Sequence, residues 1–253
     1  MNPNRFFMLF VSAWLAAALG AFVLLFFRPA PYGRHMKDYR GLTVASRQGW
    51  VVMEAISFFM MLFLYLSGNR RGDRTALVFL GMWLLHYAYR SFVFSPLKRT
   101  GDKRMPLAIL TASLVFNAVN AYINGRFLFY LAPVYPARWI FSPRFYSGAV
   151  LFLVGFLINL QSDHILRGLR KTGEKTYRVP HGGLYRWVSC PNYFGEIVEW
   201  IGWAVATWCL PGAAFAFWTL ANLAPRSHSH HLWYKDLFDD YPPDRKALIP
   251  FLF

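Results

Sequence analysis

A glutamate and a tyrosine placed inside apolar segments suggest carbonyl chemistry. Glu54 lies within Trp50–Ser67, and Tyr87 lies within Thr75–Ser95, close to Arg90. An ionisable side chain at bilayer depth costs about 2.5 kcal/mol or more, so such residues are usually paired or line a cavity. A neutral glutamic acid and a tyrosine hydroxyl facing one cavity could both donate to a substrate carbonyl and stabilise the charge that develops on its oxygen. The spacing alone leaves a structural hydrogen bond equally open.

A second polar stripe begins near the end of the apolar run Phe145–Asp163. Spacings of four, four and three place on one helix face Asn159, Asp163, Arg167 and Arg170. Polar acceptors followed by guanidinium groups suit a ligand that has a polar ring and phosphates, because arginine binds phosphate bidentately. A solvated basic helix end with an internal Asp–Arg pair is the equally open alternative.

The segment that follows, Lys171–Tyr193, is basic and rich in turn residues. Tyr177 and Arg178 could stack on a nucleotide and pair with it. The pair Gly182-Gly183 is not a dinucleotide fingerprint, since no strand precedes it and the G-x-G-x-x-G pattern is absent. We therefore expect no Rossmann-type cofactor site.

Polar groups also mark two later segments. Glu196 and Trp200 share a helix face, and Asn192 precedes them, so its amide could bond into the same cavity. Hydrogen bonding between helices is the alternative for a carboxylate here. His230 and Tyr234 lie one turn apart, but no H-E-x-x-H pattern or nearby carboxylate accompanies them, so ligand hydrogen bonding is favoured and no metal site is predicted.

The composition indicates a membrane protein. Of the 253 residues, 56% are hydrophobic and only 15% are charged, whereas a soluble domain has about 25% charged residues. The net charge of +15 does not indicate nucleic acid as a partner, because the charges cluster in short segments between apolar runs. Two isolated cysteines are too few for a disulfide framework or a metal cluster.

Seven apolar runs are candidate transmembrane helices, and the last two are short and joined by Leu210-Pro211-Gly212 as a helical hairpin. The runs are Phe6–Phe27, Trp50–Ser67, Thr75–Ser95, Pro106–Ala132, Phe145–Asp163, Phe194–Leu210 and Gly212–Ala224. Lys and Arg concentrate after the first, third, fifth and seventh runs. The sequence therefore predicts an all-α polytopic bundle of seven transmembrane helices, with the N-terminus outside and the C-terminus cytoplasmic.

Several short runs are distinctive in combination. They are Pro31-Tyr32-Gly33-Arg34-His35, the Glu54 region, His86-Tyr87 with Arg90–Val93, Asn159–Lys171, Tyr177–Pro180, Gly182–Leu184, Asn192–Ile197, Glu199–Gly202 and Asp240–Phe251. Together these runs resemble the membrane steroid 5α-reductases (3-oxo-5α-steroid 4-dehydrogenases). The resemblance covers nearly the whole chain and is densest from Asn159 onward.

The resemblance implies an NADPH-dependent reductase of the 4,5 double bond of 3-oxo-Δ4-steroids, with hydride delivered to C5. Tyr87 and Glu54 would hold the 3-keto oxygen as the catalytic residues. Residues 1–253 would form one membrane-embedded domain, with substrate-side helices in 1–132 and a mainly cofactor-binding half in 145–253. The positions similar to cofactor contacts are Arg99, Asn159, Asp163, Arg170, Tyr177, Arg178, Asn192, Glu196, Trp200, Arg226, His230 and Tyr234.

We expect a monomeric, multi-pass protein of the bacterial inner membrane or the endoplasmic reticulum membrane, with an apolar steroid entering from the bilayer. Alternatives stay open. One is reduction of another apolar enoyl lipid, such as a polyprenol or an enoyl thioester. Another is a methyltransferase of the isoprenylcysteine type, but His230-His231 stands where such enzymes carry an Arg and a Glu–Glu pair. A non-catalytic scaffold fits the polar stripes least well.

Overall fold

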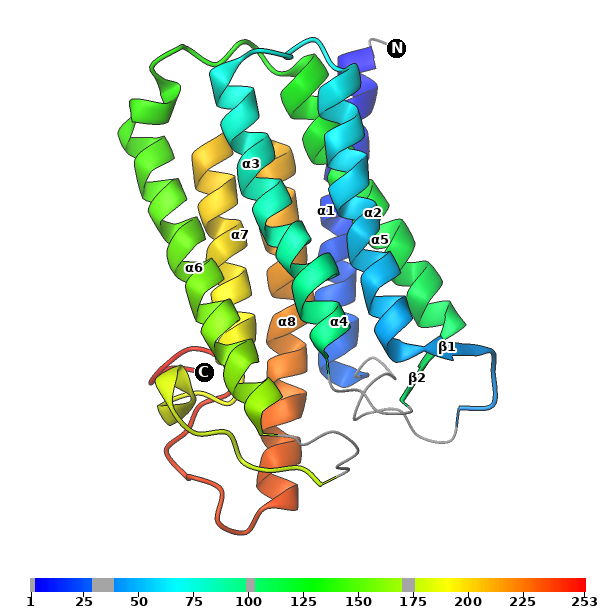
Figure 1. Ribbon diagram of the computed structural model, residues 1–253, viewed down its shortest axis with the longest axis vertical. Coiled ribbons are helices and arrows are strands. Elements are labelled where there is room, and N and C mark those ends of the chain that lie inside the picture. Colours follow the sequence, from blue (N-terminus) through cyan, green and yellow to red (C-terminus); the bar gives the residue numbers. More distant parts are fainter. Residues whose placement is uncertain (1–2, 29–38, 99–102, 170–175) are drawn as a thin grey trace. The chain divides into compact units, whose positions relative to one another are not determined.

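The computed structural model describes residues 3–28, 39–98, 103–169 and 176–253, and within them the fold is all-α, as predicted (Figure 1). Seven long helices run through these ranges, and the third continues through a short π-helical segment. They are α1 (Pro3–Phe27), α2 (Ser46–Ser67), α3 (Arg74–Ala88), α5 (Leu107–Arg126), α6 (Pro143–Gly168), α7 (Pro191–Thr207) and α8 (Leu210–Leu237).

Five helical stretches are long and apolar enough to cross a membrane, which confirms five of the predicted spans as candidates. They are Asn4–Phe27, Ser46–Ser67, Arg74–Leu97, Leu107–Leu131 and Pro143–Gly168. The 17-residue helix α7 is shorter than the ~20 residues that a perpendicular span needs. A tight connection joins α7 to α8 as predicted, but it consists of Trp208 and Cys209, and the expected junction Leu210-Pro211-Gly212 forms the first turn of α8.

The last helix is longer than the sequence indicates. A proline lacks the amide hydrogen of the helical ladder and usually ends a helix, so the seventh run was expected to stop at Ala224. Instead α8 continues through Pro225, which is buried, as far as Leu237. The extension places Arg226, His230 and Tyr234 at intervals of four residues on one helix, and therefore on one face.

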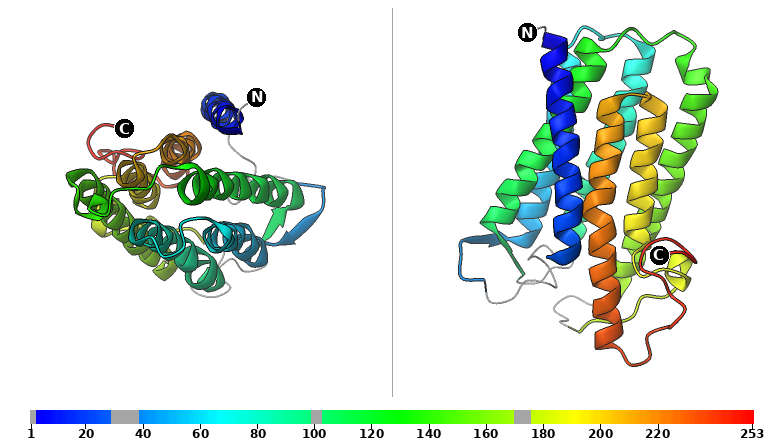
Figure 2. Two further views of the ribbon diagram at one scale, coloured as in Figure 1. Left: turned by 90° about the horizontal axis from the view of Figure 1, so that it is seen from above. Right: turned by 180° about the vertical axis from the view of Figure 1, so that it is seen from behind.

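The described helices divide into two compact units. Helices α1 and α6–α8 form one unit, and the stretch from α2 to α5 forms the other. Within the α1/α6–α8 unit, α1 runs beside α8 (Figure 2). Trp218 Nε1 donates a hydrogen bond of 2.9 Å to the Trp14 carbonyl, and the two indole rings lie 4.8 Å apart. The predicted division of substrate and cofactor functions between residues 1–132 and 145–253 stays a prediction.

Four glycines set the distance between α6 and α7. Gly148 and Gly155 on α6 face Gly195 and Gly202 on α7, and the two glycines on each helix are seven positions apart. A Cβ atom added at Gly155 would lie 2.3 Å from the backbone nitrogen of Glu199. Only hydrogen side chains allow backbones to pack this closely. We call this contact the glycine seam; it holds the two helices in one register.

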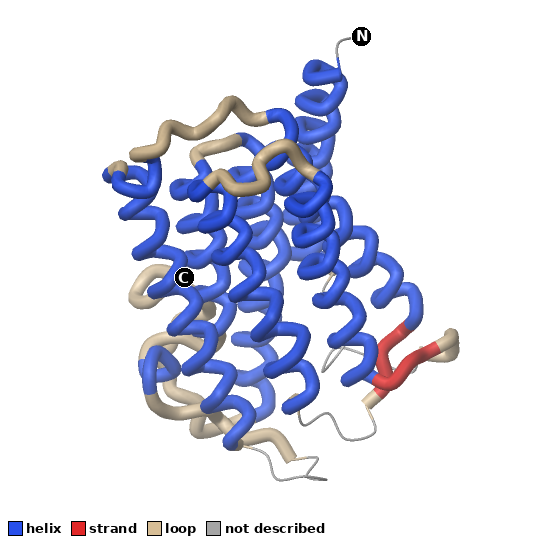
Figure 3. The backbone as a smooth tube through the Cα atoms, turned by 45° about the horizontal axis from the view of Figure 1, so that its top comes forward, coloured by secondary structure: helices blue, strands red, loops and turns tan. Residues whose placement is uncertain are grey.

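A small ribbon closes one end of the α2–α5 unit (Figure 3). Strands β1 (Thr43–Ala45) and β2 (Arg104–Pro106) pair antiparallel, directly before α2 and α5 respectively. The Arg104 guanidinium donates to the Thr43 side chain at 3.1 Å and to its carbonyl at 2.8 Å. Arg104 is therefore held by the ribbon, which the helical pattern of the sequence did not predict.

Candidate functional site

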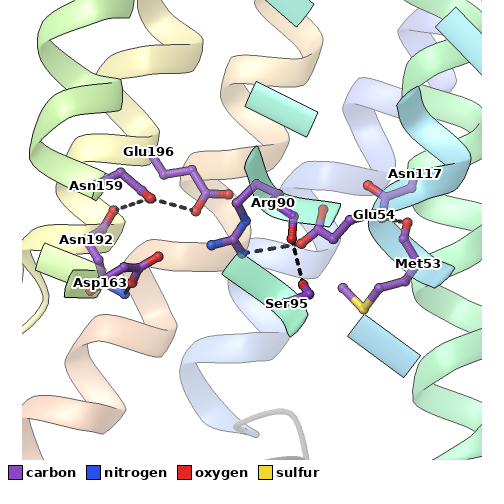
Figure 4. A network of polar contacts seen from close by, with 9 residues as sticks. All are labelled: Met53, Glu54, Arg90, Ser95, Asn117, Asn159, Asp163, Asn192 and Glu196. Carbon is purple, nitrogen blue, oxygen red and sulfur yellow. Dashed lines mark hydrogen bonds and ion pairs between the residues drawn. The ribbon is translucent and has the colours of Figure 1, made fainter. Parts of the chain in front are cut away.

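Glu54 and Arg90 form a buried ion pair inside the α2–α5 unit. Arg90 Nη2 donates to Glu54 Oε1 at 3.3 Å, and the two side chains are only 8% and 10% exposed (Figure 4). The carboxyl group that we considered from the sequence as a donor to a carbonyl therefore also accepts a hydrogen bond from a guanidinium group, through its Oε1 atom.

A π-helical turn at the end of α3 determines the direction of the Arg90 side chain. The segment η2 (Tyr89–Phe94) is π-helical and continues into α4 (Ser95–Leu97). Both the backbone nitrogen and the hydroxyl of Ser95 donate to the Arg90 carbonyl, the hydroxyl at 2.7 Å. Single π-turns inside helices often occur at functional sites. Here the π-turn turns the Arg90 side chain over the Phe94 ring, with its Cζ atom 4.6 Å from the ring centroid.

Two hydrogen bonds with α5 and one with α3 hold α2 in place around Glu54. Asn117 Nδ2 donates to the Met53 carbonyl at 2.6 Å, and the Ser57 hydroxyl donates to the Asn117 carbonyl at 3.2 Å. Trp83 Nε1 donates to the Ser57 carbonyl at 3.2 Å. Amide side chains commonly join apolar helices in this way. These hydrogen bonds make Asn117 a support for Glu54 that sequence reasoning did not connect to the site.

Tyr87 lies in the same unit and is only 2% exposed. Its ring packs against Trp83 at 5.2 Å and His86 at 4.9 Å between centroids. It precedes Arg90 by three residues, so the two side chains leave neighbouring turns of the helix. The α2–α5 unit thus gathers a phenol, a carboxylate and a guanidinium in surroundings that exclude most water.

A second cluster spans α6 and α7. Asn159 Nδ2 donates to the Asn192 carbonyl at 3.0 Å and to Glu196 Oε2 at 3.2 Å. Asn192 Nδ2 in turn donates to Asp163 Oδ1 at 3.4 Å (Figure 4). The glycine seam brings these groups together, because Gly155 lies one turn before Asn159 and Gly195 lies directly before Glu196. The structure therefore unites four of the predicted cofactor contacts.

Tyr185 supports this cluster and was missed by sequence reasoning. It lies on the 3-10 turn η5 (Gly183–Arg186), is 1% exposed, and donates to the Ser162 carbonyl at 3.5 Å. Burial, and secondarily the Asp163 carboxylate, raises the pKa of Tyr185 well above its ordinary value. Tyr185 therefore stays protonated beside Asp163.

Tyr193 on α7 bonds to two of the predicted contacts, which lie on α8. Arg226 Nε donates to the Tyr193 hydroxyl at 3.2 Å, and His230 Nε2 lies 3.1 Å from the same oxygen. The Tyr193 and His230 rings stack at 5.7 Å. Tyr234, one turn further on, is 4% exposed and stacks on Tyr241. Tyr193 thus holds Arg226 and His230 in place. Its neighbours in the sequence did not indicate this role.

The remaining predicted contacts are more dispersed. Tyr177 packs its ring against Trp233 at 4.8 Å, and Arg178 is exposed. Trp200 is 1% exposed and packs against Phe215 at 4.4 Å, so it lies in the aromatic core of its unit. Arg99 and Arg170 lie outside the described residues. The cofactor role of all of these stays a prediction.

The donor and acceptor set of the α1/α6–α8 unit fits a dinucleotide. The bonded Asn159, Asn192 and Glu196 offer amide and carboxylate groups of the kind that recognise a carboxamide. Arg178 and Arg226 offer guanidinium groups of the kind that bind phosphates. Within the described ranges, no three His, Cys, Asp or Glu side chains gather in a way that could hold a metal ion.

The sequence is similar to known proteins over nearly its full length. Residues 103–253 match the family model described as 3-oxo-5-alpha-steroid 4-dehydrogenase. The chain is 44% identical to 3-oxo-5-alpha-steroid 4-dehydrogenase 1 of Macaca fascicularis over 250 residues, which cover 97% of this chain and 94% of that protein. It is 42% identical to the Bos taurus protein of the same name, covering 97% of both chains. It is 38% identical to steroid 5-alpha-reductase DET2 of Gossypium hirsutum, covering 93% of both.

Proposed function

Because the chain belongs to the 3-oxo-5α-steroid 4-dehydrogenase family, we propose that it reduces the 4,5 double bond of 3-oxo-Δ4-steroids with NADPH. The family expected from the sequence is thereby confirmed. Membership in a family of oxidoreductases supports the reductase over the methyltransferase and the scaffold. The observation that carries the proposal is the buried Glu54–Arg90 pair in the same unit as Tyr87.

The α2–α5 unit would hold the steroid ketone. Tyr87 can donate its hydroxyl hydrogen to the 3-keto oxygen, and a donor aimed at that oxygen stabilises the charge that develops on it during conjugate addition. Glu54 could hold the same oxygen through a carboxyl hydrogen, and its Oε1 also accepts a hydrogen bond from Arg90. We therefore assign the donor role first to Tyr87, and to Glu54 the tasks of supporting Tyr87 at the ketone and of orienting Arg90. The low exposure of all three strengthens their electrostatic effects.

The α1/α6–α8 unit would bind the cofactor through the predicted contacts: Arg99, Asn159, Asp163, Arg170, Tyr177, Arg178, Asn192, Glu196, Trp200, Arg226, His230 and Tyr234. Bound NADPH supplies a hydride, which ends on C5 of the enone, and C4 then takes a proton. Asn159 fits the task of positioning the carboxamide, because Asn192 and Glu196 fix the orientation of its amide group. The arginines fit the phosphates.

We further propose that α7 and α8 complete a seven-helix membrane domain with the N-terminus outside and the C-terminus in the cytoplasm. The asymmetric placement of Lys and Arg supports this orientation. The protein would act as a monomer in a bacterial inner membrane or an endoplasmic reticulum membrane, and the steroid would enter from the bilayer.

The test is an assay of the purified protein in detergent or nanodiscs with NADPH. We expect testosterone or progesterone to cause loss of the nicotinamide absorbance and to form the 5α-reduced product. Enoyl thioesters and polyprenols are assayed in parallel. Turnover of one of these, with no Δ4-3-ketosteroid reduced, would assign the substrate to the alternative class of apolar enoyl lipids.

A further inference from the structure

The hydroxyl of Ser189 joins three separate segments of the chain. Ser189 lies two residues before α7 and is 2% exposed. Its Oγ lies 2.6 Å from Nδ1 of His231 on α8, 2.7 Å from the Tyr241 hydroxyl in the C-terminal tail, and 3.1 Å from the Lys246 carbonyl. A serine hydroxyl donates one hydrogen and accepts two, so these three partners use its full capacity.

Backbone pairing reinforces the same junction. Val188 and Lys246 form a parallel β-bridge. The Ser189 nitrogen donates to the Lys246 carbonyl at 2.8 Å, the Cys190 nitrogen donates to the Ala247 carbonyl at 3.2 Å, and the Lys246 nitrogen donates to the Trp187 carbonyl at 2.8 Å. The tail is therefore fastened to the segment that leads directly into Asn192 and the rest of α7.

The junction also touches the tyrosine on α8 that we assign to cofactor binding. The Tyr241 ring stacks on Tyr234 at 5.4 Å and an interplanar angle of 9°. Its other contacts hold it in place: Arg245, which is 4% exposed, lies with its Cζ atom 5.1 Å from the Tyr241 centroid. The Ser189 hydroxyl thus holds the Tyr241 ring against Tyr234. Through His231 it also holds the turn of α8 that carries His230.

We propose that Ser189 is a positioning residue for cofactor binding, acting through Tyr241 and His231 on Tyr234, His230 and Asn192. Ser189 is not itself among the proposed cofactor contacts. The inference rests on the proposed function, because it assumes that those three residues meet NADPH. It assigns to the C-terminal tail a direct part in cofactor affinity rather than a general part in stability.

The experiment measures NADPH affinity directly, by equilibrium binding to the purified full-length protein without steroid, together with kcat and both Michaelis constants. Ser189→Ala removes the hydroxyl contacts with His231, Tyr241 and the Lys246 carbonyl, and is expected to weaken NADPH binding about tenfold, because their loss reaches the cofactor only through neighbouring residues. The value of kcat should change less than about twofold. Ser189→Thr keeps the hydroxyl and is expected to restore affinity. Tyr241→Phe keeps the stacked ring and removes the hydroxyl; combined with Ser189→Ala it should add little, because both remove the same bond.

Ser227→Ala is the matched control, since it removes another fully buried hydroxyl whose bond, to the Ala224 carbonyl at 2.7 Å, stays within α8. Its NADPH affinity should match that of the unmodified protein. Unchanged affinity in Ser189→Ala, or equal losses in Ser189→Ala and Ser189→Thr, would overturn the positioning role while leaving the reductase intact. Failure of the unmodified protein to bind NADPH would instead overturn the proposed function and this inference with it.

Discussion

Arg90 reaches Glu54 across 3.3 Å in a part of the protein that is nearly closed to water. The two charges lie on different helices, and each would be costly to bury alone. Changing either residue should therefore affect the stability of the α2–α5 unit. Stability is tested below by changing Arg90, and the proposed role in activity is tested by changing Glu54.

Tyr87→Phe is expected to lower turnover by about 10²-fold, the scale of losing one donor to a developing oxyanion. The Michaelis constant for NADPH should stay unchanged. The measurement is steady-state kinetics with a Δ4-3-ketosteroid. Tyr65→Phe is the control, since Tyr65 is also buried in this unit but bonds only weakly to the Gly72 nitrogen at 3.5 Å. A near-normal rate in Tyr87→Phe would remove Tyr87 from the chemistry.

Arg90→Gln is expected to lower the free energy of unfolding by about 3–5 kcal/mol, because it leaves the buried Glu54 carboxylate without its cationic partner. The double variant Glu54→Gln/Arg90→Gln should be more stable than Arg90→Gln, since no charge then remains at this position. Thermal and denaturant unfolding in detergent, set out as a double-mutant cycle, measures the difference. Additive losses would show that the two side chains do not interact in solution.

The activity of Glu54→Gln distinguishes two roles for this carboxylate. A glutamine amide can donate a hydrogen bond as a neutral glutamic acid does, but it cannot pair with Arg90 as a carboxylate does. We expect kcat to fall by at least about tenfold, the effect of misplacing one charged group in a dry site. Steady-state rates between pH 6 and 8 are the measurement. Full activity would mean that Glu54 works as a neutral donor.

Gly155→Ala is expected to separate α6 from α7, because its methyl group would lie 2.3 Å from the Glu199 nitrogen. Asn159 would then lie too far from α7 to bond to the Asn192 carbonyl and to Glu196. Because these two hydrogen bonds are lost, the affinity for NADPH should fall by more than about tenfold. Equilibrium binding measures this loss. Gly168→Ala on the same helix is the control, since a Cβ there meets nothing within 4 Å. Equal affinities in both variants would contradict a positioning role for the glycine seam.

Acid should destabilise the attachment of the tail through His231. Burial, and then the positive charge of Lys235, lowers the pKa of His231. A base with a lowered folded-state pKa binds more protons when unfolded, so stability is complete above the ordinary histidine range, about 6.5, and is lost as pH falls through it. The groups facing His231 are His228 and Lys235 on α8, Arg245 and Lys246 in the tail, and the Ser189 and Tyr241 hydroxyls.

The measurement is the melting temperature in detergent between pH 8 and pH 5.5, for the unmodified protein and His231→Gln. The melting temperature of the unmodified protein should fall further on acidification than that of His231→Gln. Identical pH dependence in the two proteins would place the acid-sensitive group elsewhere.

The sequence indicated the polar residues of both units but not how they are joined. Asn159, Asn192 and Glu196 were expected to line a polar cavity, because polar groups in apolar helices require partners, and the family resemblance implied that they contact the cofactor. The hydrogen bonds among these residues depend on the glycine seam. The position of a glycine in an apolar helix does not indicate which other helix packs against it. The pairing of Glu54 with Arg90 depends on a π-turn, which shifts the helix by one residue and leaves no mark in the hydrophobic pattern.

The continuation of α8 past Ala224 was missed for a different reason. Local propensity places a helix end before Pro225, and the polar residues that follow resemble a tail. In the folded chain, burial of Pro225 and the contacts of Arg226 and His230 with Tyr193 outweigh the lost backbone bond. Such contacts join residues far apart in sequence, so a local pattern cannot reveal them.

That uninterrupted helix has a mechanical consequence. Arg226, His230 and Tyr234 recur at every fourth position of one rod, whose other end is fastened to the first helix through Trp218. A twist of the rod about its long axis carries all three side chains together. The contacts of these three side chains with a ligand would therefore strengthen or weaken together. Contacts made by residues on separate loops could change one at a time.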